Sequence, residues 1–228
     1  MAPELKPILA RRTMAGEVYS QLRAALMEGV FETGDSFAIS DLAQRFGTSN
    51  TPVREALRRL TDEGALIEGK WNSATLPGLS AAGHDQLCKA RKVIEGGAAE
   101  LAADTITPDE LAALRDISHR HQSALLDGRV EDMLAANKDF HFTIYRAARS
   151  PILLEQIENL WLRSGPYTRF LSEKMRDILK ADVTLSHARN HDHILAALEA
   201  RDGAATRRAM MDDISSVRDW MAAFLKDA

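Results

Sequence analysis

Residues 39–60 constrain this chain more than any other segment, because they spell two short amphipathic helices joined by a tight turn. Gly47 lies where the first helix has to end, at a position that favours the left-handed conformation. Ser49 or Asn50 can cap the second helix, and Pro52 fits its first turn, where no amide hydrogen is needed. The pattern predicts a helix-turn-helix. Its apolar residues recur at helical spacing: Leu42, Ala43 and Phe46, then Val53, Ala56, Leu57 and Leu60.

The opposite face of the second helix is polar and basic, as expected of a helix that lies in the DNA major groove. It carries Thr51, Arg54, Arg58 and Arg59. An ordinary helical hairpin with a solvated basic face is the alternative, so the flanking segments matter. The residues expected to contact bases or phosphates are Ser49, Asn50, Thr51, Pro52, Arg54 and Arg58, with Lys70 and Asn72 in a neighbouring turn.

The flanking segments favour the DNA-binding interpretation. Upstream, a helix is expected from Thr13 to Gly29, with Thr13 as its cap. Downstream, residues 64–76 predict two short strands around a turn at Lys70–Ser73. Three helices and a hairpin indicate a winged helix-turn-helix domain over residues 13–78, preceded by a flexible arm over residues 1–12.

The remainder, residues 79–228, shows no strand pattern and predicts an antiparallel all-α bundle of about six to seven helices. The fold class is therefore mainly α. Ser80 can cap the first of these helices, and residues 107–110 form a capping box. The Ser164-Gly-Pro166 and Asp202-Gly203 segments are expected to end helices. The helices are expected near 81–104, 108–126, 130–148, 151–163, 167–180, 183–200 and 204–226.

The stretch from Ile39 to Gly64 resembles the N-terminal domain of the GntR family of bacterial transcription regulators, whose most recognisable part is Thr-Pro-Val-Arg-Glu-Ala-Leu, here residues 51–57. The helical remainder resembles the ligand-binding domain of the FadR subfamily, called FCD. The resemblance implies a homodimeric repressor that binds a palindromic double-stranded operator and responds to a small organic acid. This chain departs from the family where Asn50 replaces arginine and where Asn72-Ser73 replaces Arg-Gly.

Four polar residues of the expected bundle are spaced so that they can meet. Asn137 and His141 are four residues apart and share one helix face. His191 and Asp213 are each 11 positions from Asp202, and residues equidistant from the turn of an antiparallel helical hairpin lie side by side. Two imidazoles, a carboxylate and an amide oxygen suit a divalent transition metal such as Zn²⁺ or Ni²⁺. The alternative is a set of separate polar positions on the surface or in the core.

The resemblance to FCD domains bears on this cluster. The family pattern is Asp-x-x-x-His, then Glu-His-x-x-Ile-Leu, then a third histidine. Residues 137–141 match the first element with asparagine for aspartate, residues 190–195 match the second, and Asp213 replaces the third histidine. Both replacements offer oxygen, so a borderline metal should bind less tightly. His193 is expected to face away from the cluster, and His187 is a reserve ligand.

Arg91 begins a segment, residues 91–95, that matches the subfamily's Arg-x-x-Leu-Glu, whose arginine commonly faces the ligand cavity. A guanidinium can bind a carboxylate in bidentate fashion, so Arg91 is the candidate anchor for a small carboxylate effector. A solvated arginine on a charged helix face is the alternative. Arg163 and Tyr167 are weaker candidates for ligand binding.

Composition narrows the function classes. The net charge of −4 argues against indiscriminate nucleic-acid binding, so DNA binding should need dimerisation and specific contacts. No apolar stretch is long enough to span a bilayer, and the N-terminus has no signal-peptide core. The single cysteine, Cys88, fits a reducing compartment. The expected protein is cytoplasmic and has no membrane partner.

The rival interpretation is a metal-dependent helical hydrolase that uses the same cluster of Asn137, His141, His191 and Asp213. No His-Glu-x-x-His and no nucleophile motif occurs, and a hydrolase leaves the winged helix unexplained. The sequence therefore predicts a protein that is not an enzyme. A regulator that has lost its effector is a third alternative.

Overall fold

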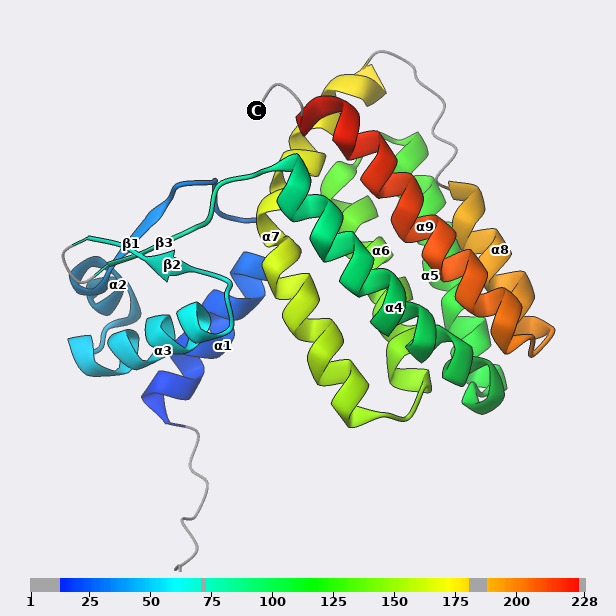
Figure 1. Ribbon diagram of the computed structural model, residues 1–228, viewed down its shortest axis with the longest axis horizontal. Helices are drawn as coiled ribbons and strands as arrows, with labels where there is room; N and C mark the ends of the chain where they lie inside the picture. The colour runs from blue at the N-terminus through cyan, green and yellow to red at the C-terminus, as the bar shows by residue number, and fades with distance from the viewer. Residues whose placement is uncertain (1–12, 71–72, 181–187, 226–228) are drawn as a thin grey trace, which may run out of the picture.

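The computed structural model of the chain describes residues 13–70, 73–180 and 188–225. These residues form nine helices and a three-stranded antiparallel sheet. Figure 1 shows a small N-terminal domain, α1 to β3, beside a larger helical bundle, α4 to α9. The mainly α fold with an N-terminal winged helix and a C-terminal helical domain is confirmed. The expected arm over residues 1–12 lies outside the described residues, as do Asn72 and His187.

Caps and turn residues that are visible in the sequence account for the helices of the winged-helix domain. Helix α1 spans Met14–Met27, and the Thr13 side chain caps it by accepting a hydrogen bond from the Gly16 amide at 3.1 Å. Helices α2 and α3 span Ile39–Phe46 and Asn50–Asp62. Between them Gly47 has φ of 61°, the left-handed conformation expected at the end of α2.

The sheet has one strand more than the sequence pattern predicts. Strand β1 (Ser36–Ala38) precedes the helix-turn-helix, and β2 (Ile67–Glu68) and β3 (Ser73–Thr75) follow it. The order is β1-β3-β2, with Phe37 opposite Ala74. Strand β1 was missed because three residues are too few to show an alternating pattern, and only pairing with β3 reveals it.

The bundle consists of six helices among the described residues. Helix α4 lies between α9, α7 and α6 and contacts all three. The capping box at Thr107–Glu110 is present and Ser80 caps its helix, both as expected, and Asp202 caps α9. None of the helices in the described ranges is long and apolar enough to cross a membrane. The helices are α4 (Ala81–Thr105), α5 (Pro108–Leu126), α6 (Val130–Ala147), α7 (Pro151–Lys180), α8 (Ala188–Glu199) and α9 (Gly203–Phe224).

The predicted break at Ser164-Gly-Pro166 is wrong, because α7 continues through Pro166 as one helix. Proline removes the backbone hydrogen bond to the Leu162 carbonyl, and the neighbouring hydroxyls bind other carbonyl groups of the helix. Ser164 donates to the Leu160 carbonyl at 2.8 Å, and Thr168 donates to the Ser164 carbonyl at 3.2 Å. The Gly-Pro pair also lies in a packed contact with α1, where tertiary packing stabilises the helix.

This contact joins the two domains. A Cβ atom placed on Gly165 would lie only 1.9 Å from the Leu26 carbonyl oxygen, so the end of α1 rests on the bare backbone of α7. Gly29 has φ of +66°, and a Cβ on it would lie 2.8 Å from the Arg169 amide nitrogen. We call the contact of Leu26 and Gly29 with Gly165 and Arg169 the α1 seat. It requires glycine on both sides.

Replacement of Gly165 by alanine tests the α1 seat. Alanine should stabilise an exposed helix by about 0.5–1 kcal/mol relative to glycine. We expect Gly165→Ala instead to lower the free energy of unfolding by about 1–3 kcal/mol, because the new methyl group overpacks the contact with Leu26. The measurement is urea unfolding followed by circular dichroism.

Gly78→Ala is the control for this substitution. Gly78 lies in the linker after β3, and a Cβ there would meet nothing within 4 Å. Its unfolding midpoint should match that of the wild type. A stabilised Gly165→Ala protein would show that the seat has room for a side chain.

Candidate effector cavity and nucleic-acid interface

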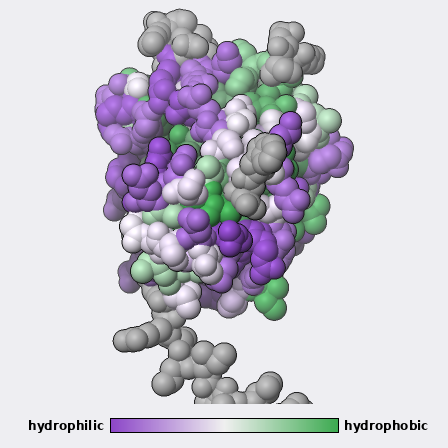
Figure 2. Space-filling view, turned by 90° about the vertical axis from the view of Figure 1, so that its left-hand side faces the viewer, coloured by the Kyte–Doolittle hydropathy of each residue, from purple (hydrophilic) through white to green (hydrophobic). Residues whose placement is uncertain are grey.

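The outward face of α3 carries the side chains expected to contact DNA. Thr51, Arg54 and Arg58 are exposed. They lie on the helix opposite Val53 and Leu57, which are buried in the core. At the start of the helix, the expected contact residues Ser49 and Asn50 are exposed, and Pro52 is half-buried. Figure 2 views the molecule from the winged-helix side, where hydrophilic side chains cover much of the surface.

Arg59 is on the same helix but is engaged inside the domain. Its Nε atom donates to Glu63 Oε1 at 3.1 Å, and its guanidinium lies 3.7 Å from the centre of the Tyr19 ring. The Tyr19 hydroxyl donates to the Glu63 carboxylate at 2.8 Å. Burial and this hydrogen bond raise the pKa of Tyr19 to about 12. These contacts tie α1 to α3.

Lys70 is exposed beyond β2, at the start of the wing turn. Its carbonyl oxygen accepts a hydrogen bond from the Ser73 hydroxyl at 2.6 Å. This contact engages the backbone and not the side chain. The exposed lysine side chain is available to a partner, as expected for a residue that contacts phosphates. The second expected wing residue, Asn72, lies outside the described residues.

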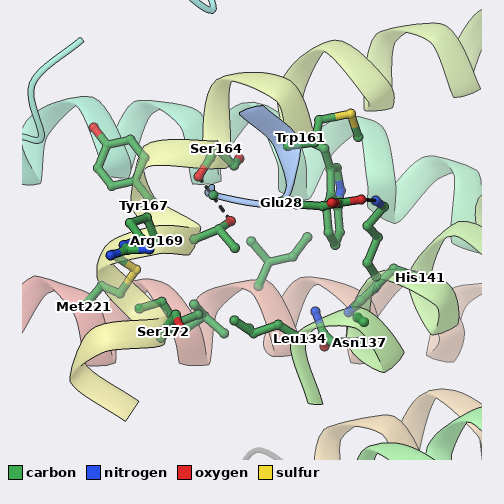
Figure 3. A pocket seen from close by; sticks show the side chains of 18 of the residues that line it. Glu28, Leu134, Asn137, His141, Trp161, Ser164, Tyr167, Arg169, Ser172 and Met221 are labelled. Carbon is green, nitrogen blue, oxygen red and sulfur yellow. Dashed lines mark hydrogen bonds and ion pairs between the residues drawn. The ribbon is translucent and has the colours of Figure 1, made fainter. Parts of the chain in front are cut away.

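A cavity of about 610 Å³ lies in the bundle, against the C-terminal end of α1. Its walls come from α4, α6, α7 and α9, and residues 27–30 of the winged-helix domain also line it. Figure 3 shows Asn137 and His141 at one end of the pocket and Tyr167 and Arg169 at the other. The cavity is thus a space of ligand size that both domains share.

The four candidate metal ligands come together at the wall of this cavity, which Asn137, His141 and Asp213 line. The ligand atoms of His141, His191 and Asp213 all lie within 4.8 Å of one another, and the three residues are buried. His141 Nε2 lies 3.2 Å from Asp213 Oδ2, and His191 Nε2 lies 3.2 Å from Asn137 Oδ1. His193 is exposed and so lies away from this cluster, as expected.

Two residues that sequence reasoning missed fix the orientation of His141. The Glu95 carboxylate is paired with Arg91, so it accepts hydrogen bonds, and the Tyr145 hydroxyl donates to it. The Tyr145 oxygen can then accept a hydrogen bond from His141 Nδ1 at 3.2 Å. This network assigns the proton of a neutral His141 to Nδ1, so the Nε2 lone pair faces the Asp213 carboxylate. Two acceptors in this arrangement need a proton or a cation between them.

The electrostatics of the cluster favour metal-binding protonation states. Burial alone would raise the pKa of Asp213, but a proton on His141 Nε2 that is donated to the carboxylate, and to a smaller extent the nearby His191, lower it to about 2. The pKa of His191 is lowered to about 3, chiefly by burial and then by His141. An ionised carboxylate and a neutral imidazole are the forms that coordinate metal ions. His191 Nδ1 is buried and makes no hydrogen bond within the described part of the chain.

Arg91 lines the cavity, but its bidentate edge is already occupied. Its Nε donates to Glu95 Oε1 at 2.6 Å and its Nη2 to Glu95 Oε2 at 3.1 Å. The guanidinium lies 4.8 Å from the Trp161 ring centre. Burial alone would lower the pKa of Arg91, but the charge of Glu95 raises it. A ligand carboxylate would therefore have to use the outer edge of the guanidinium, formed by Nη1 and the second hydrogen of Nη2, because Glu95 occupies the edge formed by Nε and Nη2.

The two weaker ligand candidates share a second depression, but only Tyr167 also lines the cavity. Tyr167 lines the cavity, and its hydroxyl donates to the Ser80 carbonyl at 3.3 Å. Arg163 is exposed and does not line this cavity. It lines a second depression of about 800 Å³ between the two domains. The structure therefore does not bring Arg163 together with Arg91.

Lys138 and Arg169 also line the cavity, and sequence reasoning did not single them out. Lys138 is adjacent to Asn137 in the sequence, but a lysine on a helix gives no local sign of a cavity. The helical spacing of Tyr145 from His141, and of Glu95 from Arg91, is four residues in each case. That spacing was a usable signal for shared helix faces.

The comparisons with known proteins agree with both parts of this arrangement. Residues 14–70 match the family described as "Bacterial regulatory proteins, gntR family". Residues 86–216 match the FCD domain. The first match covers the helix-turn-helix and its flanks, and the second covers the helices around the cavity.

Individual relatives show the same organisation. The chain is 33% identical to the HTH-type transcriptional regulator McbR of Escherichia coli strain K12, over 86% of this chain and 87% of that protein. A solved structure of E. coli McbR/YncC has a TM-score of 0.80 and 30% identity, covering 94% and 98% of the two chains. The HTH-type transcriptional repressor RspR of E. coli K12 is 25% identical over 89% of this chain and 86% of its own.

The buried His84, which lines the cavity, should make stability depend on pH. Burial, with a further contribution from Arg91, lowers its pKa to about 4, below the ordinary value near 6.5. Between these values the unfolded chain holds a proton that native His84 does not. Its contribution to stability is thus complete above about pH 6.5 and is lost as the pH falls toward 4.

We expect His84→Gln to remove this part of the pH dependence. Between pH 7.5 and pH 4 the wild type should lose about 3 kcal/mol of unfolding free energy relative to the variant, at about 1.4 kcal/mol per pKa unit. Urea unfolding at several pH values provides the measurement. The exposed His119 supplies the control, and His119→Gln should keep the wild-type profile. An unchanged profile for His84→Gln would contradict the assignment.

Proposed function

This chain belongs to the GntR family of bacterial transcription regulators and carries an FCD domain, so it is a DNA-binding transcription regulator, and we propose that it is a homodimeric repressor whose cavity binds a small carboxylate. The free protein binds a palindromic operator in the cytoplasm, where bacterial DNA lies. The effector lowers operator affinity. The relative RspR is named a repressor, which supports this sign of regulation.

One observation carries the proposal: a single chain places an exposed recognition helix and a ligand-sized cavity on either side of α1. Arg54 and Arg58 supply charge and hydrogen-bond donors for guanine edges or phosphates. Asn50 stands where the family usually has arginine, and asparagine prefers adenine, so the operator departs from the family's usual sequence.

A dimer is proposed for two reasons. A palindromic operator presents two equivalent half-sites, which a two-fold symmetric protein can bind together. The bundle also exposes large apolar side chains on the neighbouring helices α4 and α7. Val93 is 65% exposed, Leu101 47% and Ile152 74%, and burial of such side chains against a second copy would stabilise a dimer.

The cavity residues fit a divalent metal. The facing acceptors of His141 and Asp213 need a cation or a proton between them, and His191 and Asn137 add a nitrogen and an oxygen donor. FCD domains bind small-molecule effectors. A metal held here would supply an open coordination position for a ligand carboxylate, while Arg91 Nη1 and Tyr167 would orient that ligand.

The protein is not an enzyme, because its domains and its relatives are those of transcription regulators. The alternative of a metal-dependent hydrolase that uses the cluster of Asn137, His141, His191 and Asp213 is not supported. In the regulator, this cluster serves binding and not turnover.

Arg54→Ala tests the DNA interface. We expect it to weaken operator binding by about 1–3 kcal/mol per half-site, because it removes a base or phosphate contact in each protomer. The DNA is a sequence selected from a random pool by the wild type, and affinity is measured by fluorescence anisotropy. Arg115→Ala removes an equal charge from the exposed face of α5 and should leave affinity unchanged. If both variants bind alike, Arg54 does not read the operator.

Elemental analysis tests the metal site. Gently purified protein should contain about one Zn²⁺, Ni²⁺ or similar ion per chain, and His141→Ala and His191→Ala should each lose it. Both should also melt at lower temperature, because a bound ion stabilises the folded state by mass action. Asp213→His should retain the ion more tightly. His193→Ala, on the exposed face of α8, is the control. Metal-free wild type, with both cluster variants equally stable, would exclude the site.

A further inference from the structure

Two cations of the cavity lie at its boundary with the winged-helix domain. Lys138 of α6 and Arg169 of α7 both line the cavity. Their side chains are 31% and 30% exposed, so they are reachable from solvent but partly desolvated. Cations in such positions attract a carboxylate or phosphate more strongly than cations on an open surface.

Both cations are paired with carboxylates that belong to the winged-helix domain, although the Nε atom of Arg169 is also held by Glu173 Oε1 of its own helix at 2.7 Å, which leaves Nη2 for the inter-domain pair. Lys138 Nζ lies 3.2 Å from Glu28 Oε1, and Arg169 Nη2 lies 3.3 Å from Glu32 Oε1. Glu28 follows the last residue of α1, and Glu32 lies in the loop to β1. Figure 3 shows Glu28 among the side chains that line the pocket, beside Trp161. We call these two inter-domain ion pairs the charge latch.

The charge latch differs from other ion pairs near it. Arg176 also lines the cavity, but its partner Glu131 belongs to the bundle, so that pair does not join the domains. The pair Arg23–Glu158, at 3.3 Å, joins the domains but does not line the cavity. Among these pairs, those of the latch alone combine both properties.

Helix α1 connects the latch to the recognition helix. Its C-terminal end rests in the α1 seat on α7, next to Arg169. Farther back along α1, the Tyr19 hydroxyl binds Glu63 at the end of α3, and Arg59 of α3 covers the Tyr19 ring. A displacement of the end of α1 therefore moves α3 with it.

We propose that Lys138 and Arg169 are anion-binding residues of the cavity, and that Glu28 and Glu32 occupy them until an anionic ligand replaces these glutamates. The ligand class is a small molecule with at least one carboxylate or phosphate group. The inference rests on the proposed function, because it assigns the ligand and the regulation of the same cavity. Displacement of the glutamates releases the end of α1 from the bundle and lowers operator affinity.

Competition explains why the latch can respond. An exposed ion pair is worth little by itself, so a ligand that binds either cation from within the cavity can displace the glutamate. The glutamate then has no partner in the bundle and repels the bound anion. The attachment of the end of α1 to the bundle therefore weakens only when an anion occupies the cavity. This couples the cavity to the DNA-binding helix.

A charge-swap cycle tests the latch in the full-length protein. Glu28→Lys and Lys138→Glu are made singly and together, and affinity is measured for DNA selected by the wild type. We expect each single variant to bind about tenfold more weakly and the double variant to return within about threefold of wild type. Bulk charge would instead raise the affinity of Glu28→Lys and lower that of Lys138→Glu.

Arg115→Glu and Glu199→Lys are the matched controls, because they break an exposed ion pair of the bundle with the same charge changes. They should change DNA affinity only as bulk charge does, in opposite directions. Hydrogen exchange of residues 29–31 gives a second readout. Exchange there should quicken in both single variants and return to the wild-type rate in the double variant. Failure of the double variant to restore either property would overturn the latch.

Inorganic phosphate is the probe for the anion site. At constant ionic strength, it should raise the melting temperature of Glu28→Gln/Glu32→Gln at about tenfold lower concentration than that of wild type, because no glutamate has to be displaced. Lys138→Gln/Arg169→Gln should not respond. Equal responses of all three proteins would overturn the assignment of these cations. If the wild type selects no DNA, the repressor proposal fails, whereas the exchange and phosphate measurements still decide the latch.

Discussion

The close contact between the end of α1 and the middle of α7 is the interaction on which the rest of the structure depends. It places the Leu26 carbonyl oxygen so close to Gly165 that no side chain at residue 165 would fit. The same contact places residues 27–30 in the lining of the bundle cavity. This single backbone contact therefore holds the winged-helix domain against the bundle and places part of that domain in the wall of the cavity. It also lets a helix continue through Pro166, because the tertiary contact offsets the lost backbone hydrogen bond.

A second constraint is the buried polar network that links α4, α6 and α9. Arg91 neutralises Glu95, which has no exposed side chain, and Tyr145 connects Glu95 to His141. Arg91, Glu95 and Tyr145 each have a hydrogen-bond partner, as low-dielectric surroundings favour. The outcome is a histidine whose free lone pair faces Asp213. A residue expected to hold an effector carboxylate thus orients a candidate metal ligand through its partner.

Charge is distributed in this protein so that specific contacts replace bulk attraction. The chain carries a net charge of −4, yet the outward face of α3 presents Arg54 and Arg58 without paired carboxylates among the described contacts. Arg59, one residue farther, is also exposed but is held at the surface by Glu63 and Tyr19. Affinity for DNA must then come from a few well-placed side chains, which also makes it sensitive to small movements of α3.

The sequence by itself determined the features that arise from neighbouring residues. The left-handed Gly47, the caps at Thr13 and Ser80 and the mainly α class follow from local backbone preferences, which act over a few residues. Helical spacing also brought together the faces of the candidate metal cluster. Only the tertiary structure decided that α7 continues through its Gly-Pro pair, that strand β1 forms, and that the Nε and Nη2 atoms of Arg91 bind Glu95. It alone placed Lys138 and Arg169 at the boundary between the domains. These outcomes depend on contacts between distant segments, and a side chain shows no sign of such a partner in its own sequence neighbourhood.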